Sequence, residues 1–288
     1  MQNNALVRIF AILFVIVSIY QLSFTFISSN EERKAKTFAK GSISDEVSNY
    51  LELRDEIESD YLDSVGQISL YGITSYDDAK KLYVASKPYI VKSLDEKGLV
   101  FLYAVPWPAQ GLYSKKQIKK VGDLNGLKFR AYNSATIRIA ELTGMAPTKI
   151  EAAEISQAFS TGAVESMITS PTTGKNSKIW ENGVKYFYDI AAWFPKNMII
   201  ANKAAWNKLD KATQDLVMNQ AAIAEEKGWE LSKQGNTGDK KALADAGMEV
   251  GEVNSALKKH FEKVGATMSE EWKAKAGDRG AAVLSAYK

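Results

Sequence analysis

The stretch from Gly126 to Thr173 constrains the fold of this chain most, because strand-like and helix-like segments alternate along it with short turns. It predicts strands at Leu127–Ala131, Ala146–Ile150 and Ser166–Thr169, with helices between them at Ser134 to about Leu142 and at Ile155–Ser160. Strands that alternate with helices are typical of parallel βαβ units. Ligands of such sheets bind beyond the carboxyl ends of the strands. We therefore predict an α/β fold with a binding site at that edge.

Polar side chains follow the first and third of these strands. Arg130, Tyr132 and Asn133 end the first strand, and Thr169 and Ser170 end the third. A guanidinium fork beside short hydroxyls at one edge of a sheet suits a carboxylate ligand. The alternative role for Arg130 is that of a structural salt-bridge partner.

Aromatic residues flank two further predicted strands. The apolar run Leu99–Val105 predicts a buried strand, and Trp107 and Gln110 lie in the Pro-rich loop after it. Trp193 precedes the strand predicted at Met198–Asn202. Each tryptophan either stacks on a ligand or fills a junction between two parts of the protein, and the sequence leaves both possibilities open.

The composition excludes several classes of function. The chain has 288 residues and a formal net charge of +3, too small for a nucleic-acid-binding surface. It has no cysteine and a single histidine, His260, which excludes thiolate and histidine-cluster metal sites. We expect His260 to be a solvated helix residue. No nucleophile–base set, P-loop or HExxH motif is present, so we predict a binding protein without a cofactor rather than an enzyme.

The run Ile9–Ile27 carries no charged residue and is about long enough to span a bilayer. It is longer than the apolar region of most secretory signals, and no clear small-x-small cleavage site follows it. We predict an uncleaved membrane anchor over residues 1–30, followed by a charged spacer over residues 31–70. The lysines and arginines after the run would place its carboxyl side in the cytoplasm.

The remaining helices are predicted from capping residues, periodicity and breakers. Two helices are expected within Tyr76–Gly98, divided at Pro88. A long helix is expected from Lys211 to about Gln234, interrupted by Gly235–Gly238. Two more helices are predicted after it, at Ser255–Gly265 and Ser269–Ala276.

Four long motifs, in order, carry a resemblance over about Ile73 to Lys288. They are SYDDAKKLY, VGDLNGLKFRAYN, IEAAEISQAFSTGAVES and WFPKNMIIANKAAWNKLDKATQD. This part of the chain resembles the DctP-like solute-binding proteins of tripartite ATP-independent periplasmic (TRAP) transporters. The resemblance implies a periplasmic-binding-protein-like fold of two lobes with a long bracing helix. It also implies that a small organic carboxylate is captured by lobe closure and delivered to a membrane permease.

The same resemblance assigns roles to single residues and marks two departures. LKFRA places Arg130 at the family's substrate-carboxylate arginine, and Ser170 falls where many members carry a polar amide. The family often has a second arginine near the Trp107 loop; here Gln110 is the nearest polar residue. Members also begin with a strand–helix–strand unit that supplies about half of the first lobe. We therefore expect a solute-binding domain over residues 71–288 with an incomplete first lobe and its second lobe at about 122–192.

Residues Met1 to about Leu70 resemble the amino-terminal anchor of the SecD subunit of protein export. This resemblance implies an inner-membrane anchor with a periplasmic domain after it, opposite to the charge count. It carries over no export activity. Two alternatives to solute capture stay open at this point: a membrane-anchored fragment that binds nothing, and an accessory protein of the Sec machinery.

Overall fold

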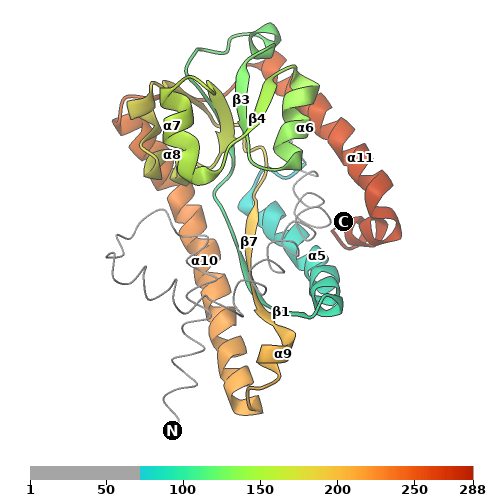
Figure 1. Cartoon of the computed structure of the whole chain (residues 1–288). Coiled ribbons are helices and arrows are strands. Elements are labelled where there is room, and N and C mark those ends of the chain that lie inside the picture. Colours follow the sequence, from blue (N-terminus) through green and yellow to red (C-terminus); the bar gives the residue numbers. More distant parts are fainter. Residues whose placement is uncertain (1–71, 288) are drawn as a thin grey trace, which may run out of the picture. The chain divides into compact units, whose positions relative to one another are not determined.

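The computed structural model describes residues 72–287, in which two β-sheets are joined by crossing segments and a long helix (Figure 1). The predicted anchor and spacer lie outside the described residues. The elements are α5 (Tyr76–Glu96), β1 (Leu99–Pro106), β2 (Gly111–Ser114), η2 (Val121–Leu124), β3 (Lys128–Ala131), α6 (Ser134–Thr143), β4 (Ala146–Lys149), η3 (Ala152–Glu154), α7 (Ile155–Ser160), β5 (Ser166–Thr169), α8 (Pro171–Asn176), η4 (Ile179–Asn182), β6 (Tyr186–Tyr188), β7 (Lys196–Asn202), α9 (Lys203–Trp206), α10 (Lys211–Asp245), β8 (Glu249–Gly251) and α11 (Ser255–Tyr287).

The larger sheet has six strands in the order β4-β3-β5-β2-β6-β8. Strand β3 is parallel to both β4 and β5, so the predicted βαβ alternation is confirmed. Strand β2 lies antiparallel between β5 and β6, and β8 is parallel to β6. Because β2 and β8 join this sheet, it takes in residues on both sides of the expected 122–192 range.

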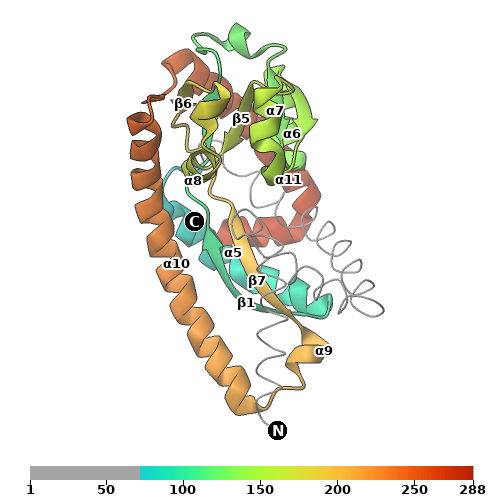
Figure 2. The same ribbon diagram turned by 60° about the vertical axis from the view of Figure 1, so that its left-hand side comes forward.

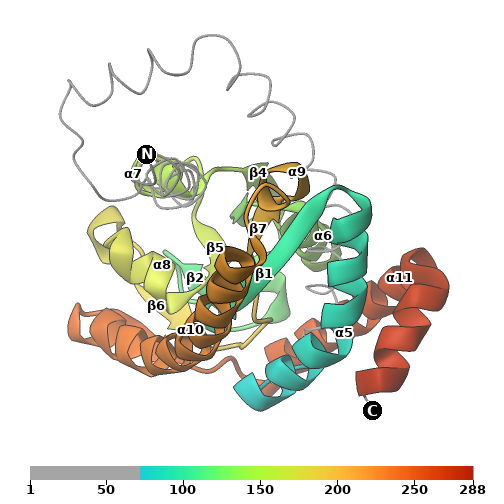
Figure 3. The ribbon, with the colours of Figure 1, turned by 90° about the horizontal axis from the view of Figure 1, so that it is seen from below.

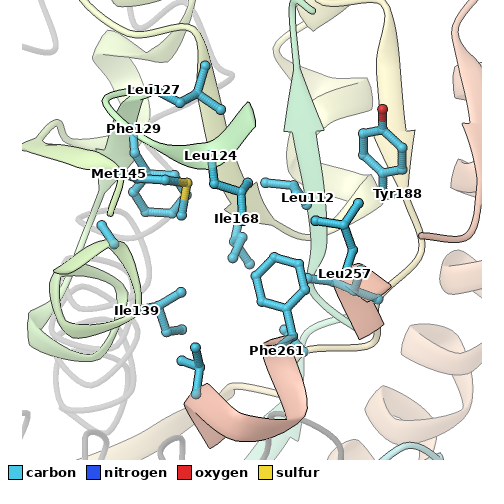
Figure 4. Close-up of a cluster of buried hydrophobic side chains, with 14 of the residues drawn as sticks. Leu112, Leu124, Leu127, Phe129, Ile139, Met145, Ile168, Tyr188, Leu257 and Phe261 are labelled. Carbon is cyan, nitrogen blue, oxygen red and sulfur yellow. The ribbon is translucent and has the colours of Figure 1, made fainter. Parts of the chain in front are cut away.

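Neighbouring residues of the central strands bury opposite faces of this sheet. Leu112 of β2 and Ile168 of β5 enter one core, which α6 and α11 cover with Ile139 and Phe261 (Figure 4). Tyr113 and Met167, each next to one of these residues, enter a second core on the other face. Since the side chains of a strand alternate between its faces, strands buried on both sides are continuous apolar runs. Each large side chain buried in this way contributes about 1.5–3 kcal/mol.

The smaller sheet consists of β1 and β7, which pair antiparallel from Leu99↔Asn202 to Pro106↔Lys196. Helix α10 covers the other edge of β1. Trp229 Nε1 donates to the carbonyl oxygen of Ala104 at 3.1 Å, and the Ala104 amide donates to Glu225 Oε2 at 3.1 Å. Within the described residues β7 pairs with β1 alone, so its outer edge is open.

Two segments cross between the sheets side by side. Residues 107–110 lead from β1 to β2, and residues 189–195 lead back from β6 to β7. The Trp107 amide donates to the Pro195 carbonyl at 2.7 Å, and the Gln110 amide donates to the Trp193 carbonyl at 3.0 Å. Helix α10 runs alongside as a third link, from the α9 end of β7 to the larger sheet (Figure 2).

Three helix boundaries differ from the sequence predictions. Helix α5 is continuous through Pro88, and it packs beside α11 (Figure 3). Pro88 is exposed, so water can satisfy the carbonyl group that loses its intrahelical donor. Helix α11 runs without a break across the expected gap after Gly265; its one non-helical residue is Gly277, with φ of 53°. Its buried face, which includes Phe261, Met268 and Trp272, stabilises the continuous form.

Helix α10 also continues through the two glycines that were expected to interrupt it, over 35 residues. Tertiary contacts hold the chain there. Asp239 is buried and accepts hydrogen bonds from Thr172 Oγ1 at 2.5 Å and from Lys175 Nζ at 2.6 Å. Both partners lie on α8, so these bonds fix the carboxyl half of α10 to the larger sheet. Among the helices of residues 72–287, none is both long and apolar enough to span a bilayer.

Candidate functional site

Arg130 lies in β3, near the edge of the larger sheet where the strands of its βαβ units end. The residue is 4% exposed. Its Nε donates to the Ile150 carbonyl at 2.9 Å, and Cζ lies 4.8 Å from the centre of the Tyr132 ring. Within residues 72–287 it has no carboxylate partner, so the salt-bridge alternative is not realised here. Within residues 72–287 its Nη atoms have no hydrogen-bond partner, and neither atom is fully buried. Both atoms therefore remain available to an anion.

Burial lowers the pKa of Arg130, while Tyr132 and Glu151 act in the opposite direction. An arginine remains charged after such a shift because its ordinary pKa exceeds 12. The site therefore presents a fixed, partly desolvated positive charge. A carboxylate that displaces the remaining water gains more from this charge than it would at an exposed position.

Tyr132 links Arg130 to Gln110. The Tyr132 hydroxyl lies 3.4 Å from Gln110 Oε1, close to the limit for a hydrogen bond. Gln110 Nε2 donates to the Pro108 carbonyl at 2.9 Å, and the side chain is buried. The structure thus brings together three of the predicted site residues, Arg130, Tyr132 and Gln110. Arg130 lies on the larger sheet, and Gln110 lies on a crossing segment.

Thr169 and Ser170 lie at the end of β5, where Thr169 is opposite Gly111 of β2. Within residues 72–287 the Thr169 hydroxyl has no hydrogen-bond partner, and its oxygen is not fully buried, so a ligand can reach it. Ser170 is the N-cap of α8, where its Oγ accepts from the Thr173 amide at 3.0 Å. Its hydroxyl is therefore committed to helix capping, and Thr169 is the freer donor of the two.

Asn133 has a similar capping role at the start of α6. Its Oδ1 accepts from the Thr136 amide at 2.9 Å. N-cap asparagines stabilise a helix by about 1 kcal/mol relative to alanine. The predicted ligand contact of Asn133 thus competes with a structural use of the same oxygen.

The two tryptophans occupy different surroundings. Trp193 is buried in the core shared with α11, so the structure places it at a junction of elements. Trp107 is half-buried, and its amide is bonded to Pro195 in the crossing segments. Tyr113, in the neighbouring strand β2, is fully buried beneath Gly174 and donates to the Ser170 carbonyl at 3.1 Å. It is a core residue.

The expectation of a solvated His260 is wrong. The ring is half-buried, and its Nε2 is a buried atom without a hydrogen-bond partner. Burial, with a smaller contribution from Lys263, lowers its pKa. Its surroundings therefore favour the neutral ring. Among residues 72–287 no group of three or more His, Asp or Glu side chains is placed to hold a metal.

One cation beside the crossing segments was not predicted as a site residue. Lys196, the first residue of β7, is half-buried, and its Nζ lies 3.4 Å from the Phe194 carbonyl. Burial lowers its pKa to about 8. The only sequence signal was a lysine placed between Trp-Phe-Pro and an apolar strand, and surface lysines often occupy such positions.

Comparison with known proteins places this arrangement in a family. The model of the bacterial extracellular solute-binding protein family 7, DctP, matches residues 68–275. The chain is similar to DctP7 of Bordetella pertussis, an extracytoplasmic solute receptor binding pyroglutamic acid, with 37% identity and a TM-score of 0.78 over 81% of this chain and 77% of that one. It is also similar to DctP6 of the same organism, another receptor binding pyroglutamic acid, with 40% identity and a TM-score of 0.77 over 80% and 76%.

A curated relative is a solute-binding protein of Albidiferax ferrireducens, 26% identical over 61% of this chain and 52% of its own length. The chain thus spans about half the length of the curated relatives that it matches. The family model begins at residue 68, so it lends no support to the SecD-like resemblance of the preceding residues.

Proposed function

Because this chain belongs to family 7 of the bacterial extracellular solute-binding proteins, the DctP family, we propose that it captures a small organic carboxylate outside the cytoplasm. The observation that carries the proposal is the guanidinium of Arg130. It is buried, oriented by Ile150 and Tyr132, and has no carboxylate partner within residues 72–287. A buried cation of this kind is a poor structural element alone and a good receptor for an anion.

We propose pyroglutamate as the first ligand to test, because the two Bordetella receptors at 37% and 40% identity bind pyroglutamic acid. Its single carboxylate matches Arg130. Its lactam group needs one donor and one acceptor, which the Thr169 hydroxyl and the Gln110 amide oxygen supply.

The mechanism that we propose is closure of the two sheets around the ligand. The crossing segments at residues 107–110 and 189–195 would act as the hinge. A ligand drives such closure only by binding the closed state more tightly than the open one. The closed form would then deliver its ligand to the membrane permease subunits of a TRAP-type transporter, the partner that the family implies.

We further propose that the run Ile9–Ile27 remains uncleaved and anchors the binding domain at the periplasmic face of the inner membrane. Its length and the lack of a clear cleavage site support this. Mass spectrometry of membrane fractions should then find the intact amino terminus. A shorter chain that begins near residues 29–39 in the soluble fraction would identify the run as a signal peptide.

The proposed function is tested by calorimetry on the full chain. We expect pyroglutamate to bind and its uncharged counterpart, pyroglutamamide, to bind at least about tenfold more weakly, because only the acid meets Arg130 as an ion pair. Succinate and orotate complete the panel. Equal binding of the acid and the amide would contradict carboxylate recognition. If none of the carboxylates binds, the alternative of a membrane-anchored fragment that binds nothing is favoured.

A further inference from the structure

Lys196 stands where a crossing segment enters the smaller sheet. It is opposite Pro106 in the β1–β7 ladder, and the neighbouring Pro195 carbonyl accepts a hydrogen bond from the Trp107 amide. The side chain therefore belongs to the stretch of backbone that joins the two sheets.

Within the described residues, the ammonium group of Lys196 lacks the carboxylate partner that comparable lysines have. Its contact with the Phe194 carbonyl measures 3.4 Å, whereas charge-assisted bonds are about 2.7–2.9 Å long. At other junctions of the structure, Lys175 bonds Asp239 at 2.6 Å and Lys87 bonds Glu225 at 3.2 Å. Lys196 has no carboxylate partner within residues 72–287.

A chain of contacts connects Arg130 with the crossing segment that leads to this lysine. The Arg130 guanidinium stacks on Tyr132, whose hydroxyl reaches Gln110. The Gln110 amide in turn donates to the carbonyl of Trp193, three residues before Lys196. The two cations thus stand at opposite ends of one connected stretch, Arg130 on the larger sheet and Lys196 on the smaller.

From this arrangement we infer that Lys196 is a second cation of the ligand site, which faces the bound carboxylate from the smaller sheet while Arg130 holds it from the larger. This inference rests on the proposed function. It adds to that function a residue that couples ligand charge to closure, since a single anion would attract both sheets.

The titration of Lys196 makes the inference measurable. Burial lowers the pKa of Lys196 to about 8, and no charged side chain contributes to that shift. Strand β1 carries one titratable side chain, Tyr103, and on α5 the ring of Tyr76 packs on Phe194, the residue whose carbonyl Lys196 contacts. Burial raises the pKa of Tyr76 to about 12, and arginine does not titrate in this range.

A bound carboxylate favours the charged form of Lys196 and so raises its pKa. Below about pH 8 the lysine is already charged, and the affinity is at its maximum. Above that pH, binding must take up a proton, so the affinity falls by up to about tenfold per pH unit until the pKa of the complex is reached.

The experiment measures the affinity of the full chain for pyroglutamate at pH 7.0, 8.0 and 9.5, for the natural chain, Lys196→Met, Lys196→Arg and Lys203→Met. Lys203 is the matched control, because it begins α9 just beyond the far end of β7 and pairs with Asp95 at 2.5 Å. We expect the natural chain and Lys203→Met to lose at least tenfold between pH 7.0 and 9.5. Lys196→Met should bind at least tenfold more weakly at pH 7.0, with a flat pH profile, and Lys196→Arg should bind well at every pH.

Thermal unfolding separates this role from a structural one. If the unpaired charge serves the ligand, Lys196→Met should unfold at the same or a higher temperature than the natural chain without ligand. Unchanged affinity and an unchanged pH profile in Lys196→Met would overturn the inference alone. If the natural chain binds no carboxylate on the panel, the proposed function fails and the inference fails with it.

Discussion

Arg130 is the residue on which we propose that ligand recognition depends. One edge of its guanidinium group is used by the Ile150 carbonyl and one face by the Tyr132 ring. These contacts restrict its rotamers before any ligand arrives, so little side-chain entropy is lost on binding. Its planar fork is suited to both oxygens of one carboxylate, which a lysine cannot reproduce.

Replacement of Arg130 by lysine keeps the charge and removes the bidentate geometry. A charge-assisted hydrogen bond contributes about 1.5–3 kcal/mol, which corresponds to roughly tenfold to a hundredfold in affinity. We expect a loss in that range when pyroglutamate is titrated by calorimetry. Arg138→Lys is the control, because Arg138 pairs with Glu141 and Glu271 on the α6–α11 side. If Arg130→Lys binds pyroglutamate as tightly as the natural chain does, Arg130 is not part of the ligand site.

Helix α10 is the element that connects the two sheets independently of the crossing segments. Its amino-terminal half bonds Ala104 of β1 through Glu225 and Trp229, and its carboxyl-terminal half bonds α8 through Asp239. The close approach to β1 depends on a glycine. A Cβ at Gly228 would lie 2.2 Å from Val105 Cγ1, and valine is restricted at χ1, so it cannot move away freely.

Gly228→Ala should therefore destabilise the protein by about 1–3 kcal/mol, the usual cost of overpacking. Gly238→Ala, on the same helix, is the matched control, because a Cβ there meets nothing within 4 Å. That change should stabilise the protein by about 0.5–1 kcal/mol, because alanine loses less conformational entropy in a helix. Urea unfolding followed by circular dichroism measures both. Equal effects of the two substitutions would show that α10 does not pack on β1 as closely as described.

At the scale of the whole described region, the two sheets differ in how completely they are built. Strand β5 lies between two neighbours, and its four residues are all buried. Strand β7 carries Met198, Ile199 and Ile200 yet has no buried residue, and within residues 72–287 it has one partner. An open apolar edge of this kind is poorly protected from solvent and prone to pair with other strands.

Hydrogen exchange should reveal this difference. We expect amides of β7 that point away from β1 to exchange at least about tenfold faster than those of β5, after correction for intrinsic rates, because they open without global unfolding. Mass spectrometry of peptides from the full chain resolves the two strands. Uniformly slow exchange along β7 would mean that its outer edge is paired in solution.

Local patterns in the sequence determined the βαβ alternation around β3 and the position of Arg130 near a strand end. These features depend on residues close together in the chain. Tertiary structure alone decided that α10 continues past Gly235, and that Lys196 is desolvated with no counter-charge within residues 72–287. Each of these outcomes depends on groups distant in sequence, and burial and long-range contacts outweigh local preferences of about 1 kcal/mol.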